Sequence, residues 1–170
     1  MQEAVRTLLP EGRLAELQLR AYDCGGDGAC MYKSFAHQLA RLNIRLTWIQ
    51  VKARALQWLK ARNAAALHDL RPALVLSLPA TAAILPLAPS PAEWSATVDV
   101  AYGAEQSWGD ELMLRSLASE FQVNVRLMGP GHDRDIHGAQ QQTPAALFTL
   151  VHIAETHYQS TAPLPNATQP

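Results

Sequence analysis

The sequence is poor in cysteine and has no excess of basic residues. Its 170 residues contain two cysteines, Cys24 and Cys30, too few for a disulfide framework, which favours a reducing compartment such as the cytoplasm. The formal net charge is −1, so the basic surface of a nucleic-acid-binding protein is not expected. With no metal-ligand spacing around the two cysteines, a small metal-binding protein ranks last among the possible classes.

Long apolar runs are also missing, with one apparent exception. Residues 72–92 carry no charge, but five prolines interrupt them, which predicts an irregular apolar loop instead of a transmembrane helix. The first 13 residues lack the apolar core of a secretory signal, so neither export nor a membrane is expected.

The composition, 48% hydrophobic and 17% charged, predicts one globular domain, placed here at residues 1–160. A tail at 161–170, rich in Pro, Ala, Thr and Asn, is expected to be disordered. Apolar spacing and capping residues predict a helical lead-in at 1–20, then helices at 30–43, 47–66, from 91, and 107–121, the last opened by a Ser107-x-x-Asp110 capping box. Strands are expected at 123–127 and 147–153, with a loop or loose hairpin at 131–145. Helices first and strands late indicate an α+β fold.

The helix predicted at 47–66 has one apolar side. Trp48, Val51, Ala55, Leu59 and Arg62 share that side, and Thr47 is the expected N-cap. We expect Lys52, Arg54 and Lys60 to lie away from it.

Cys30 is the first candidate for chemistry. It follows the glycine-rich segment Gly25-Gly26-Asp27-Gly28-Ala29 and opens a helix. The field of a helix N-terminus favours thiolate over thiol, and free N–H groups around Gly28 and Ala29 could bind a developing oxyanion. The alternative is a small buried residue at the start of a core helix.

A thiolate nucleophile requires a base, and the chain has six histidines. His37 lies seven residues after Cys30 on the same helix, about 10 Å along its axis, too far for a hydrogen bond. Of the others, His152 lies inside an expected strand and His157 just after it; His157 leads His152 only modestly. Asp27, three residues before Cys30, could cap the helix, hold the loop for oxyanion binding, or do both.

Three segments together resemble a known family. Asp27-Gly28-Ala29-Cys30-Met31-Tyr32-Lys33-Ser34-Phe35-Ala36 resembles the nucleophile motif of OTU (ovarian tumour) cysteine proteases. Ser107-Trp108-Gly109-Asp110-Glu111-Leu112 looks like the family's Trp-Gly segment, shortened by a residue or two, and Val151 to Tyr158 looks like its closing strand and His-Tyr pair. The resemblance covers residues 20–160.

The resemblance implies a papain-like α+β fold and a deubiquitinase without metal or cofactor, monomeric, acting on ubiquitin or polyubiquitin chains. Cys30 would attack the bond after the C-terminal Gly-Gly of ubiquitin, His157 would act as base and then acid, and a thioester would be hydrolysed. Trp108 and Gly109 would help form the groove for the Gly-Gly tail. That tail is basic, which makes the carboxylates of Asp99, Glu105, Asp110 and Glu111 candidate contacts, with solvated surface charge as the alternative.

One position departs from the family pattern. Many members have Asp or Asn two residues after the catalytic histidine, whereas this chain has Gln159. Gln159 could orient the imidazole weakly, the Cys–His pair could act alone, or Asp23 or Asp27 could take the role, Asp23 being the more speculative.

Other functions stay open at this point. The chain could cleave a polyprotein or a ubiquitin-like modifier, or bind ubiquitin without catalysis, although both Cys30 and His157 are present. Its richness in alanine, leucine and arginine fits a GC-rich genome and thus a bacterial effector delivered to the host cytosol; a viral origin is also compatible.

Overall fold

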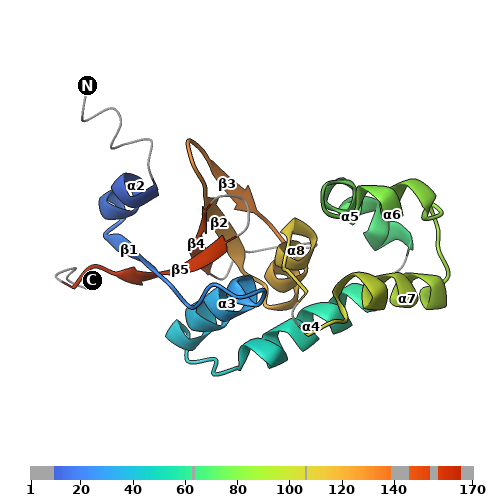
Figure 1. Cartoon of the computed structure of the whole chain (residues 1–170), viewed down its shortest axis with the longest axis horizontal. Helices are drawn as coiled ribbons and strands as arrows, with labels where there is room; N and C mark the ends of the chain where they lie inside the picture. The colour runs from blue at the N-terminus through green and yellow to red at the C-terminus, as the bar shows by residue number, and fades with distance from the viewer. Residues whose placement is uncertain (1–9, 63, 106, 139–145, 154–156, 166–170) are drawn as a thin grey trace.

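The computed structural model describes residues 10–62, 64–105, 107–138, 146–153 and 157–165 (Figure 1). The described elements are seven helices and five strands: α2 (Pro10–Glu16), β1 (Leu19–Tyr22), α3 (Cys30–Arg41), α4 (Trp48–Lys60), α5 (Ala64–Ser77), α6 (Pro79–Ile84), α7 (Pro91–Tyr102), α8 (Glu111–Glu120), β2 (Asn124–Met128), β3 (Asp133–Ile136), β4 (Leu147–Ile153) and β5 (His157–Pro163). This arrangement confirms the predicted α+β class.

The five strands form one mixed sheet with the order β1-β5-β4-β2-β3. The β2–β4 pair is parallel and the other neighbours are antiparallel. Helix α3 packs on β5, and α8 packs on α4 and α5 (Figure 1). The sheet therefore lies at one end of the molecule and helices α5 to α7 at the other.

Helix α3 is fixed between the sheet and α4 by its apolar side. Phe35 is fully buried, with its ring 5.1 Å from that of Phe148 on β4 and 5.7 Å from that of Phe121 after α8. The helix stops at Arg41, and Asn43 adopts a left-handed φ of 62°, a backbone conformation that asparagine tolerates better than most residues. The core thus fixes the position of Cys30, the first residue of this helix.

The segment 72–92 corrects the sequence prediction, because most of it is helical. Helix α5 continues through Pro72, α6 begins with Pro79, and α7 begins with Pro91 after a Ser90 cap that accepts from the Glu93 N–H. Pro79 and Pro91 fit the first turn of their helices because the N–H that proline lacks would have no partner there. These two prolines therefore begin helices and do not break them. Among the described residues, no helix is both long and apolar enough to cross a bilayer.

Other boundaries also differ from the prediction. The helix from Thr47 ends at Lys60, well short of residue 66. Asp110, not Ser107, caps α8, accepting from the Met113 N–H. Of the expected lead-in helix at 1–20, residues 1–9 lie outside the described part of the chain and α2 covers Pro10–Glu16. The last two residues of the expected helix instead begin β1, which spans residues 19–22 and pairs with β5.

The C-terminal residues 161–163 continue β5 instead of starting a disordered tail. The Leu164 N–H donates to the Gln18 carbonyl at 2.9 Å, which extends the ordered domain past residue 160. Pairing with β1 supplies the hydrogen bonds that keep these residues extended. Residues 166–170 of the predicted tail lie outside the described part of the chain.

Candidate active site

Cys30 lies at the N-terminus of α3 with 1% of its surface exposed. The turn before it is closed by a hydrogen bond from the Cys30 N–H to the Asp27 carbonyl, 3.0 Å. From the opposite side, the Tyr158 N–H of β5 donates to the Cys30 sulfur at 3.4 Å. The sulfur is therefore in contact with the peptide unit that follows His157.

His157 begins β5, opposite Ile153 of β4. Its Nε2 lies 3.2 Å from the Asp23 Oδ1, and its side chain is 24% exposed. A carboxylate can only accept, so a hydrogen bond here places the proton on Nε2 and leaves the lone pair on Nδ1. Nδ1 is then the ring atom available to take a proton from a thiol.

Asp23 is itself held in place by the loop that follows it. Its Oδ1 also accepts from the Gly25 N–H at 2.9 Å, and Gly25 has a φ of 106°, a conformation that side-chain-bearing residues rarely adopt. A Cβ on Gly26 would lie 4.0 Å from the His157 ring. The loop therefore covers the imidazole and presents a carboxylate to it. The structure thus brings the most speculative orienting candidate to the histidine.

Asp27 bonds to the turn before Cys30 and to Lys33, whereas Asp23 bonds to His157. Its Oδ1 accepts from the Ala29 N–H at 3.1 Å, and its Oδ2 accepts from the Lys33 ammonium at 2.6 Å. The hydrogen bond from Lys33, reinforced by the Ala29 N–H, lowers the pKa of this carboxyl group. Asp27 therefore shapes the turn before Cys30.

This bonding bears on the expected oxyanion donors. In the present conformation the N–H groups of Ala29 and Cys30 already donate to Asp27, the first to its carboxylate and the second to its carbonyl. Gly28 lies between Asp27 and Ala29, and its N–H group stays a candidate oxyanion donor. An oxyanion bound by Ala29 would have to replace the Asp27 carboxylate.

Trp108 and Gly109 lie on the segment that leads into α8, and Gly109 packs against the residue that follows Cys30. A Cβ on Gly109 would lie 2.2 Å from the Met31 Cε, and Met31 directly follows Cys30. Trp108 is 53% exposed, so it is not the core aromatic that a helix start could have required. An exposed indole therefore directly precedes the glycine that contacts Met31.

Replacing Gly109 with alanine is expected to lower stability by about 1–3 kcal/mol, because the new methyl group overlaps the fully buried Met31 side chain. Chemical denaturation would measure this loss. Gly131→Ala is a matched control for packing, since nothing lies within 4 Å of a Cβ there, although its φ of 81° adds local strain. If Gly109→Ala costs as much stability in a Met31→Ala background as it does in the wild type, the proposed clash is contradicted.

The other residues considered for the site make contacts of their own and are not shown to contact Cys30 or the His157 ring. Gln159 follows two residues after His157 on β5, opposite Val151. His152 stacks on the Tyr158 ring at 4.4 Å. His37 bonds Ser160 through Nδ1 and stacks on Tyr22, and burial lowers its pKa. Burial raises the pKa of the Cys24 thiol, which disfavours its thiolate form.

The acidic residues considered for a basic tail fall into two groups. Asp110 is committed internally, because its Oδ2 accepts from the Tyr102 hydroxyl at 2.6 Å and its Oδ1 caps α8; burial raises its pKa. Asp99 pairs with Lys60, and Glu111 pairs with Arg134 at 2.9 Å. Glu105 is exposed. Asp110 is therefore withdrawn as a tail contact.

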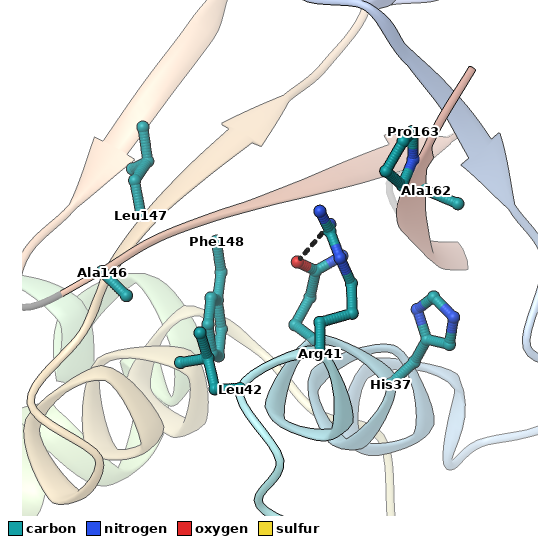
Figure 2. Close-up of a pocket in the computed structure, with 9 residues that line it drawn as sticks. His37, Arg41, Leu42, Ala146, Leu147, Phe148, Ala162 and Pro163 are labelled. Atoms are coloured by element: carbon teal, nitrogen blue, oxygen red, sulfur yellow. Dashed lines mark hydrogen bonds between the residues drawn. The ribbon is translucent and has the colours of Figure 1, made fainter. Parts of the chain in front are cut away.

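A pocket of about 430 Å³ lies at the other end of α3, where β4 and β5 separate (Figure 2). Arg41 reaches into it and donates to the Gln38 side chain and the Thr161 carbonyl. At 1.5 Å per residue, Arg41 is about 16 Å along the helix from Cys30. This pocket is thus separate from the candidate active site. Among the described residues, no group of three or more His, Cys, Asp or Glu is placed to hold a metal ion.

Together, a cysteine at the start of a central helix and a histidine on the facing strand define a papain-like α+β arrangement. No protein-family model matches the sequence, and no curated protein matches it significantly. Solved structures do resemble it. An OTU deubiquitinase from Wolbachia pipientis has a TM-score of 0.61 at 11% identity, covering 89% of this chain and 92% of that one. The OTU domain of OTUD1 has a TM-score of 0.58 at 12% identity, covering 94% of both chains.

A viral OTU protease from Farallon virus has a TM-score of 0.57 at 14% identity, covering 85% of this chain and 84% of that one. Identities this low establish the fold alone. The chain has the OTU fold, as the three sequence segments predicted.

Proposed function

We propose that this protein is a cysteine deubiquitinase that hydrolyses the bond after the C-terminal Gly-Gly of ubiquitin. The observation that carries the proposal is the contact of the Cys30 sulfur with the strand residue after His157, whose Nε2 is paired with Asp23. The OTU fold around this site adds support, because the Wolbachia pipientis structure that resembles this chain was also determined bound to ubiquitin.

The proposed chemistry needs only side chains of this chain and water. The Cys30 sulfur attacks the carbonyl carbon of the terminal glycine while His157 Nδ1 takes the thiol proton. His157 returns that proton to the leaving amine, and a thioester forms on Cys30. Water, deprotonated by the same nitrogen, then releases ubiquitin. Asp23 holds the imidazole in the required tautomer and stabilises its charged form.

Helices α5 and α6 carry exposed apolar side chains, and a pocket lies between α5 and the strands near the site. Leu76 is 68% exposed and lines a pocket of about 600 Å³ together with Leu127 and His152. His152 stacks on Tyr158, the residue after His157. Ile84 on the neighbouring helix is 84% exposed. Exposed apolar side chains of this kind are typical of protein-binding surfaces, and we propose that ubiquitin docks here.

Leu76→Asp is expected to raise the KM for a ubiquitin substrate by roughly tenfold or more, because a desolvated charge would face the docked protein. The kcat should change little. Steady-state hydrolysis of a fluorogenic ubiquitin substrate measures both. Val100→Asp is the matched control, since Val100 is 89% exposed on α7. A loss of the same size in both variants would show that the α5 surface has no special role.

The function itself is tested with an electrophilic probe attached to the C-terminus of ubiquitin. Intact-mass analysis is expected to show one ubiquitin added to the wild-type chain. Parallel probes built on ubiquitin-like modifiers determine the substrate class. Reaction with a modifier probe alone would shift the function to a ubiquitin-like protease. No reaction with any probe, combined with measurable ubiquitin binding, would leave a binding module and overturn the proposal.

A further inference from the structure

Lys52 is a buried cation that the expected site does not explain. It was predicted to lie away from the apolar side of α4, yet it is only 6% exposed. Its ammonium donates to the Ala104 carbonyl, to the Glu105 carbonyl at 3.0 Å and to the Ser107 hydroxyl at 2.8 Å. An ammonium has three donors, so all of them are used by one short stretch of chain.

That stretch is residues 103–105 and 107–110, here named the Trp108 loop. Two more bonds close it: the Ser107 hydroxyl donates to the Tyr102 carbonyl at 2.8 Å, and the Tyr102 hydroxyl donates to Asp110 at 2.6 Å. Lys52 therefore binds the middle of the loop, while Tyr102 connects its two ends.

The loop ends against the helix that carries Cys30. Gly109 packs on Met31, which follows Cys30, and Trp108, the residue before Gly109, has 53% of its surface exposed. The Lys52 nitrogen also lies 5.5 Å from the ring centre of Tyr32, two residues after Cys30. One ammonium thus joins the helix that carries Cys30 to the loop that carries Trp108.

The electrostatics of Lys52 favour a positioning role. Among the described residues, no carboxylate lies within ion-pair distance of it, and two of its three acceptors are main-chain carbonyls. Burial lowers the pKa of this lysine, with the charge of Glu105 acting in the opposite direction. Keeping a cation in such a place has a desolvation cost, which hydrogen bonds to the loop offset.

We infer that Lys52 is a positioning residue for substrate recognition: it fixes the Trp108 loop in the conformation that receives the ubiquitin tail, without acting on the thiol. This inference rests on the proposed function for its substrate. It separates two properties of one site, the reactivity of Cys30 and the placement of Trp108.

The test compares Lys52→Met, which removes the ammonium but keeps an unbranched apolar stem, with Lys60→Met on the same helix. For Lys52→Met, kcat/KM on a fluorogenic ubiquitin substrate is expected to fall roughly tenfold to a hundredfold, mostly through KM. Alkylation of Cys30 by a small haloacetamide should stay within about twofold of wild type. Lys60→Met should match wild type in both assays. An equal loss of both reactivities in Lys52→Met would overturn the inference.

A second measurement does not depend on ubiquitin. In protein labelled with 5-fluorotryptophan, Trp108→Phe assigns the Trp108 fluorine resonance. Lys52→Met should shift or broaden that resonance and leave the buried Trp94 signal in place. An unmoved Trp108 signal would overturn the inference even if the proposed deubiquitinase activity holds. A moved signal in a protein that reacts with no ubiquitin probe would instead refute the proposed function and leave the loop contact established.

Ser107→Ala covers the case in which Lys52→Met fails to fold. It keeps the lysine and removes one of its three acceptors. We expect the same changes in KM and in the Trp108 resonance at smaller size. Wild-type KM together with an unmoved Trp108 resonance would overturn the inference.

Discussion

Replacing Cys30 with alanine is expected to abolish addition of the ubiquitin probe and to reduce ubiquitin hydrolysis by about 10⁴-fold or more. The reason is that no other described thiol has the same surroundings. Cys30 lies at the start of α3 in contact with the Tyr158 N–H, whereas the Cys24 sulfur contacts the Tyr22 carbonyl at 3.8 Å and has a raised pKa. Intact-mass analysis after incubation with the probe measures the outcome.

Cys24→Ala is the matched control, since it removes the only other cysteine of the sequence. It should react like wild type. Binding of unmodified ubiquitin by Cys30→Ala should survive, because the substitution deletes one buried sulfur and leaves the surface unchanged. Probe addition that persists in Cys30→Ala and disappears in Cys24→Ala would reverse the assignment of the nucleophile.

The local sequence patterns anticipated the elements that hold Cys30. The glycine-rich turn, the apolar spacing from Tyr32 to Leu39 and the short apolar run at 147–153 each have one dominant physical interpretation. They correspond to the turn before α3, to α3 itself and to β4. Local propensity and burial favour the same structure in each of them, so no tertiary contact had to override the local signal.

The prediction failed where distant contacts decide the structure. Residues 19–22 and 161–163 carry weak local signals and become strands only because each pairs with the other. Lys52 illustrates the same limit in a side chain. It lies at the edge of the apolar side of α4, and its burial depends on the carbonyls of a loop about 50 residues later in the chain. No pattern within α4 indicates those acceptors.

In the candidate site, some residues were predicted from the sequence and others were not. Cys30 and His157 follow from the motif and its order along the chain, and the structure places them on facing elements. The sequence offered Asp23 as a partner of His157 but could not select it, because the family pattern points two residues downstream whereas Asp23 is 134 residues upstream. Only the closure of β1 on β5 brings that loop to the histidine.

His157→Ala is expected to lower kcat by about 10²–10⁴-fold, the usual contribution of a general acid–base group. Alkylation of Cys30 by a haloacetamide should slow as well, since the thiol loses its proton acceptor. His152→Ala is the comparison, because that ring stacks on Tyr158 instead of facing Asp23. A larger loss of kcat in His152→Ala than in His157→Ala would reassign the base.

The orienting residue can be resolved by comparing Asp23→Asn with Gln159→Ala. Asparagine keeps an acceptor for both His157 and the Gly25 N–H but removes the charge that stabilises the imidazolium. Because the Asp23 side chain is 59% exposed, solvent screens that charge, and we expect a moderate loss of roughly tenfold in kcat with KM unchanged. Gln159→Ala should stay within about threefold of wild type.

The opposite ranking would place the orienting group at Gln159, two residues after the histidine, in line with the family pattern. Asp23→Ala then separates charge from loop structure. It removes the acceptor for Gly25 as well, so the loop over the imidazole loses an anchor. If Asp23 acts through both contacts, Asp23→Ala lowers kcat further than Asp23→Asn does. Equal effects of the two substitutions would mean that Asp23 contributes only through the effect of its carboxylate charge on His157.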